Sequence, residues 1–103
     1  MLSASFAVGI ALASSPSLVI LDLAPESAAL VERRLLGQTA GMNLDIRVRV
    51  GRCDVAAPCV RESSEVFLLF TPGALAPRRF SGASSGRAEM VAIALAAALE
   101  AEQ

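Results

Sequence analysis

The segment Gly82-Ala83-Ser84-Ser85-Gly86 matches the G-x-S-x-G pattern that presents a serine nucleophile in α/β-hydrolases, with Ser84 in the nucleophile position. It lies between an expected short strand and an expected helix, as that motif does. A serine hydroxyl needs a general base to take its proton, and the chain of 103 residues contains no histidine. We therefore expect no catalytic residue here. We interpret the segment as a flexible loop in which Ser85 caps the following helix.

Cys53 and Cys59 are the two cysteines of the chain and lie in a polar stretch, residues 51–64, that we expect to be a loop. A zinc site needs more cysteine or histidine ligands, so we expect no metal site. Two interpretations are open. We predict that the pair forms a disulfide in an oxidising compartment. The alternative is that both remain free thiols in a reducing cytosol. Closing so small a ring would stabilise the fold by roughly 2–3 kcal/mol.

Residues 1–13 resemble a short secretory signal. An apolar run from Phe6 ends in the small-x-small pattern Ala11-Leu12-Ala13, and the polar break Ser14-Ser15-Pro16 follows. The first five residues contain no lysine or arginine, which leaves the alternative of an amino-terminal strand or helix packed on the core. The run is too short to span a bilayer, which takes about 20 apolar residues. Cleavage after Ala13 would place the domain in the periplasm or outside the cell; otherwise it is cytoplasmic.

All nine basic residues are arginines, and ten acidic residues give a net charge of −1. Because there is no basic excess, we expect no binding to nucleic acid. Several arginines cluster in sequence and form either a patch for an acidic partner or solvated surface charge offset by Glu32, Asp45 and Glu65. The second interpretation is the simpler one. The clustered residues are Arg33, Arg34, Arg47, Arg49, Arg78 and Arg79.

Hydrophobic patterning predicts alternating strands and helices. A nearly continuous apolar run predicts a central strand over 17–23, and clean alternation predicts a half-buried strand over 44–50. A third strand is expected over 65–71 and a short fourth over 78–81. Pro25 suits the first turn of a helix to about Thr39, with Ala28, Val31 and Leu35 on one face and Gly41 as the stop. A second helix is expected over 87–102.

These elements predict one α/β (α+β) domain over residues 17–102, with the order strand, helix, strand, strand, short strand, helix. A small mixed sheet of three to four strands would be covered on one face by two helices. The first helix has room to cross between parallel neighbours. The third and fourth strands would form a hairpin across Pro72-Gly73. The apolar fraction of 54% agrees with a packed domain.

The last helix has ten consecutive apolar residues, Met90 to Leu99, too few for a membrane span. We expect this helix to be integral to the core, so that Asp at Ile93 or at Leu95 unfolds the domain. Ten apolar positions cover more than one helix face, so some of this surface should pack beyond the sheet. A symmetric homodimer through this helix is the simplest arrangement that would bury this surface.

Residues 18–36 resemble the first strand and helix of a response-regulator receiver domain, with Asp22 in the place of one acid of the metal-binding pair. The chain departs from that family in two places. No second acid lies beside Asp22, and Phe70-Thr71-Pro72 ends the strand where the family has its phosphoacceptor aspartate. The resemblance implies no phosphotransfer. It implies only a cytoplasmic regulatory fragment with a degenerate receiver-like fold, acting through protein contacts.

The layout of residues 17–102 is similar to small α/β domains of bacterial cell-envelope proteins and to the amino-terminal domain of TolB-type periplasmic proteins. The similar features are a Cys-bearing strand exit, an apolar strand with a short hairpin and the Ala-rich helix RAEMVAIALAAALEAE. The resemblance implies a non-catalytic envelope domain that contacts other proteins, with no cofactor, and it supplies no binding residues. An exported interaction or structural module is therefore the function that we expect.

Overall fold

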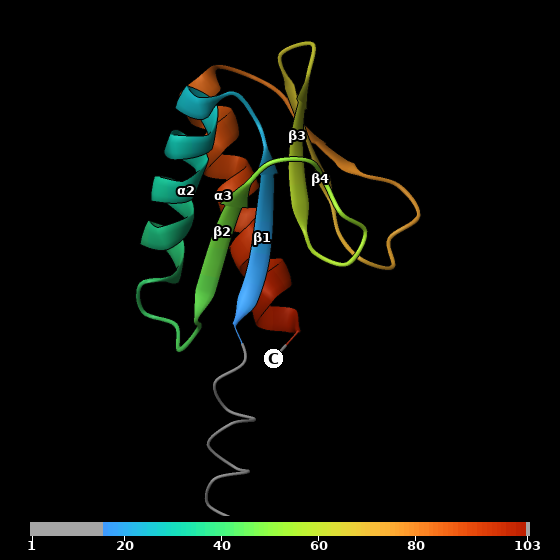
Figure 1. The fold of residues 1–103 in the computed structure, drawn as a ribbon. Coiled ribbons are helices and arrows are strands. Elements are labelled where there is room, and N and C mark those ends of the chain that lie inside the picture. Colours follow the sequence, from blue (N-terminus) through green and yellow to red (C-terminus); the bar gives the residue numbers. More distant parts are fainter. Residues whose placement is uncertain (1–15, 103) are drawn as a thin grey trace, which may run out of the picture.

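The computed structural model describes residues 16–102 and shows two helices packed on a five-stranded mixed sheet (Figure 1). The predicted signal, residues 1–13, lies outside the described residues. The elements follow in the order β1 (Ser17–Asp22), α2 (Pro25–Thr39), β2 (Ile46–Val50), β3 (Cys59–Ser63), β4 (Val66–Phe70), β5 (Arg78–Phe80) and α3 (Ser84–Ala101). The predicted fold class is confirmed.

Strand β1 occupies the middle of the parallel part of the sheet, in the order β2-β1-β3-β4-β5. It pairs in parallel with both β2 and β3, whereas β4 runs antiparallel to β3 and to β5. Its residues Val19, Ile20 and Leu21 are fully buried, as the continuous apolar run predicts. Helix α2 makes the expected crossover between the parallel strands β1 and β2.

Both helices lie on one face of the sheet, as predicted (Figure 1). Alternate residues of β1 point to opposite faces, so Val19 and Leu21 join the helices in the main core while Ile20 points to the other face. From α2, Ala28, Val31 and Leu35 enter this core, which is the face that their spacing predicts. From α3, the buried aliphatic residues are Val91, Leu95 and Leu99.

The polar stretch 51–64 is not all loop, because its second half forms strand β3. Cys59 and Val60 are buried in that strand, which pairs with β4 through a tight turn at Ser64 and Glu65, both at positive φ. The sheet therefore has one strand more than the three to four predicted. The predicted hairpin across Pro72-Gly73 is present as β4 and β5.

The last helix differs from its prediction in two ways. It begins at Ser84 with Ala83 at the N-cap position, and no side chain caps it, so Ser85 is not a cap. Ile93 and Met90 are 49% and 43% exposed. Ile93 is therefore outside the core, which removes the basis for the prediction that Asp at Ile93 unfolds the domain. For Leu95, which is 0% exposed, the prediction keeps its basis.

The strand order β2-β1-β3-β4-β5 is also that of receiver-type doubly wound sheets. Those sheets are mostly parallel and have helices on both faces. Here β4 is antiparallel and both helices lie on one face. The likeness to a receiver domain is thus limited to the strand order and the first β-α-β unit.

The connection from β2 to β3 leaves the second face of the sheet only partly covered. Strand β2 ends at Val50, beside Leu21, and β3 begins at Cys59, beside Ile20. Residues 51–58 connect the two strands, and Figure 1 shows this segment passing in front of β1 and on toward β4 before it turns back into β3, while α3 lies behind. We call the face without helices the open face.

Candidate functional site

The Cys53–Cys59 disulfide fixes the loop that crosses the open face. The two cysteines are bonded, with their Cα atoms 5.5 Å apart, which confirms the predicted disulfide. Ala57, Cys59 and Cys53 pack on Ile20 and bury it. The Ile20 amide donates a hydrogen bond of 2.9 Å to the Pro58 carbonyl, so the loop continues the pairing of β1 at the level where β3 begins.

Phe70 and Arg61 form the side of the open face next to the disulfide. Both belong to alternate positions of β4 and β3 that point away from the helices, since Phe70 is the cross-strand neighbour of Cys59. The Arg61 guanidinium lies 5.3 Å from the centre of the Phe70 ring. Its Nε donates to Asp22 Oδ2 at 3.3 Å. Asp22 is therefore paired with an arginine, whereas the receiver resemblance would make it one acid of a metal-binding pair.

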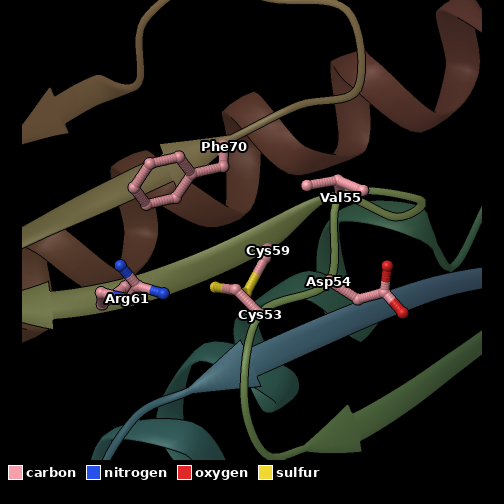
Figure 2. A pocket seen from close by; sticks show the side chains of 6 residues that line it. All are labelled: Cys53, Asp54, Val55, Cys59, Arg61 and Phe70. Atoms are coloured by element: carbon pink, nitrogen blue, oxygen red, sulfur yellow. A yellow bond between two sulfur atoms is a disulfide. The ribbon is translucent and has the colours of Figure 1, made fainter.

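A shallow depression of about 250 Å³ lies between these residues and the loop. Figure 2 shows the Phe70 ring, the disulfide and Val55 around it, with Arg61 at one end and Asp54 near the other. Asp54 Oδ1 accepts a hydrogen bond of 2.9 Å from the Ala56 amide, which shapes the loop tip. A second depression of about 220 Å³ shares Val55 and Phe70 and extends to residues 71–74. Val55 itself is 92% exposed.

Four arginines occupy the open face in three strands. By strand alternation these are Arg47, Arg49, Arg61 and Arg79. Arg47 pairs with Asp45 at 3.5 Å and Arg61 with Asp22. Within residues 16–102, Arg49 and Arg79 have no carboxylate within 4.0 Å. Leu18, 38% exposed, and the half-buried Leu68 lie among them.

The structure divides the arginine clusters of the sequence between separate surfaces. Arg47, Arg49 and Arg79 share the open face. Arg34 lies on α2, where it pairs with Glu89 of α3 at 3.6 Å. Arg78 points to the helix side, with its guanidinium 5.3 Å from the Phe80 ring. Sequence neighbours such as Arg78 and Arg79 thus lie on opposite faces of the sheet, because side chains alternate along a strand.

The Ser84 segment has the position expected of the G-x-S-x-G motif, between β5 and α3. Gly82 turns the chain with φ +118°, a conformation that glycine adopts readily, and Ser84 and Ser85 are exposed in the first turn of α3. Since the sequence has no histidine, the base that the motif requires is missing. Among the described residues no group of His, Cys, Asp or Glu side chains could hold a metal ion.

Sequence reasoning missed Phe70 and Arg61 as neighbours. Phe70 looked like one more residue of an apolar strand, and Arg61 lay in a presumed loop. A usable signal was the alternation of Cys59, Arg61 and Ser63 on one side of β3 with Val60 and Glu62 on the other. This alternation did not predict a strand, because Val60 is the one aliphatic residue on the core side of the segment.

In the part of the chain that the structure describes, no helix is long and apolar enough to cross a membrane. Comparison with known proteins found no protein-family model, no curated protein and no solved structure that matches this chain.

Proposed function

We propose that this chain is a non-catalytic recognition module whose open face binds an acidic, partly apolar segment of a partner protein. One observation supports this proposal above all others. An apolar depression lined by Phe70, Val55 and the disulfide lies on the open face beside Arg61, and three further arginines lie on the same face. Interfaces are enriched in such combinations of aromatic side chains and arginines.

The charges of the open face favour an acidic partner. Two of its four arginines, Arg49 and Arg79, have no ion pair in the described residues. A carboxylate of the partner would gain a charge-assisted hydrogen bond with either of them. A nucleic acid is disfavoured, since the net charge of the whole chain is −1 and, among residues 16–102, the open face presents one aromatic ring, Phe70, for stacking.

The test uses a synthetic peptide that alternates glutamate and leucine, and its lysine-leucine counterpart. We expect the acidic peptide to shift the NMR amide signals of Val55, Phe70 and Arg79, and the basic peptide to leave them unchanged. Reversing two charges by R49E and R79E together should weaken binding about tenfold or more, and added salt should weaken it further.

Arg33→Glu is the control, because Arg33 is exposed on α2, away from the open face. It changes the net charge in the same sense as R49E and R79E and should leave peptide affinity unchanged. The proposal fails if Arg33→Glu weakens binding as much as the double variant, if the shifted amides lie on the helices, or if neither peptide binds. Turnover of an ester panel that Ser84→Ala abolishes would contradict the non-catalytic assignment.

We propose further that the domain acts outside the cytoplasm, in the periplasm or beyond the cell. The observation that supports export is the bonded Cys53–Cys59 pair, since such disulfides persist in oxidising compartments. The sequence pattern Ala11-Leu12-Ala13 supplies a site for signal cleavage. Mass spectrometry of the protein from its native cell should show an amino terminus at Ser14 and no alkylatable thiol. An intact, reduced chain in the cytosolic fraction would refute export.

A further inference from the structure

Helix α3 exposes a stripe of side chains that points away from the core. Gly86, Met90, Ile93, Ala97 and Glu100 follow one another at steps of four, three, four and three residues, and all are exposed. This spacing places them on one side of the helix, in the pattern by which helices pair with each other. The side that faces the core contains the buried residues Ala88, Val91, Ala92, Leu95, Ala96 and Leu99.

A groove runs between this stripe and the edge of the sheet. It has a volume of about 360 Å³ and is lined by Arg78 and Phe80 of β5 and by Met90, Ile93, Ala94 and Ala97 of α3. The stripe thus offers both projecting side chains, Met90 and Ile93, and a depression beside small ones. A surface that has both features can be complementary to a copy of itself.

The two ends of α3 have opposite and unbalanced charge. The first turn has no acidic residue, and no side chain accepts a hydrogen bond from the backbone N–H groups at this positive end of the helix dipole. The last turn has no basic residue, and Glu100 adds negative charge at the negative end. Within one chain this arrangement is unfavourable. Two antiparallel copies of the helix would place each Glu100 beside the partner's amino-terminal turn.

We propose that the chain forms a homodimer in which two α3 helices pack antiparallel around a two-fold axis near Ile93. This proposal is independent of the proposed partner on the open face, because it uses the opposite side of the molecule. About the axis, Ile93 lies near its own copy, and Met90 lies opposite Ala97 of the second chain, so a large residue faces a small one. Gly86 lies opposite Glu100 and lets the helices approach closely. The paired region, residues 86–100, is about 21 Å long.

Sedimentation of the full chain over a range of concentrations tests the association. We expect a reversible dimer in the micromolar range and a monomer for Ile93→Asp, because two carboxylates would then meet near the axis. Ile93→Asp should remain folded by circular dichroism. Leu36→Asp is the matched control, since Leu36 on α2 is exposed to the same degree, 48% against 49%, and should leave the dimer intact.

Cysteine cross-linking under mild oxidation tests the orientation. Ile93→Cys should cross-link with its own copy. A mixture of Met90→Cys and Ala97→Cys chains should give the mixed dimer, whereas each of these two variants alone should cross-link poorly. A parallel pair would instead cross-link each variant with itself, which would overturn the antiparallel arrangement.

Glu100→Gln tests the charge argument separately, and at low salt it should weaken the dimer a few-fold. The proposal is wrong if the wild-type chain is monomeric at hundreds of micromolar, or if Leu36→Asp dissociates the dimer while Ile93→Asp does not. These results leave peptide binding at the open face unaffected, so the two proposals can fail independently.

Discussion

Arg87 is a buried cation in the first turn of α3. It is 7% exposed, and its guanidinium lies 4.8 Å from the centre of the Phe67 ring. Its Nε has no hydrogen-bond partner in the described structure, and no carboxylate there lies within 4.0 Å of it. A buried polar atom without a partner costs about 1–3 kcal/mol, and a cation at the positive end of a helix dipole adds to that cost. The packing of its aliphatic stem on the core acts in the other direction.

We therefore expect Arg87→Met to be at least as stable as the wild type, because methionine retains most of the apolar contact and removes the unpaired charge. Arg87→Ala removes the contact as well and should lower the free energy of unfolding by about 1–2 kcal/mol relative to Arg87→Met. Urea denaturation of the three proteins measures both differences. A methionine variant less stable than wild type by more than about 1 kcal/mol would show that the cation–π contact outweighs the unpaired Nε.

At the scale of elements, helix α2 and strand β1 could be predicted, because the apolar pattern of each segment matches the way it is buried. Helix α2 was predicted with its bounds and its buried face, because Ala28, Val31 and Leu35 recur at helical spacing and Pro25 opens the first turn. Strand β1 was predicted because both of its faces are buried. In each case the positions of the apolar residues in the local sequence match the positions that are buried in the structure.

Strand β3 could not be predicted in the same way. Its pairing with β1 depends on the stagger of two strands and on a loop that crosses between them, and neither is visible in local sequence. The buried set of α3 was also ambiguous, because ten consecutive apolar residues do not indicate which of them face the core. Only the structure separates Leu95, fully buried, from Ile93, half exposed. The candidate site depends on β3, so most of it was hidden from sequence reasoning.

At the scale of the molecule, the two faces of the sheet differ in how they are stabilised. The helix face is covered by the main hydrophobic core, whereas the open face buries only a small cluster around Ile20. The crossing loop that packs on Ile20 is tied to β3 by the disulfide. The candidate binding depression is lined by the same loop and by both cysteines, so we expect the disulfide to position the site as well as stabilise the fold.

Removing the disulfide should therefore have a global and a local effect. Cys53→Ser keeps the buried Cys59 and releases the loop, and it should lower the free energy of unfolding by about 2–3 kcal/mol, since the ring between the cysteines is short. Urea denaturation measures this global loss. Hydrogen exchange measures the local effect, which is the release of the loop. The Ile20 amide reports it, because this amide donates to the Pro58 carbonyl of the loop.

The amide of Val91 in α3 is the internal reference for that exchange experiment, since it is buried far from the loop in the main core. If the disulfide holds the loop on the open face, Ile20 should lose more protection than Val91 in Cys53→Ser, and the NMR signals of Phe70 should broaden or shift. If the disulfide acts only by restricting the unfolded chain, both amides lose protection equally and the Phe70 signals stay unchanged. That second result would contradict the positioning role and leave the stability loss as the whole effect.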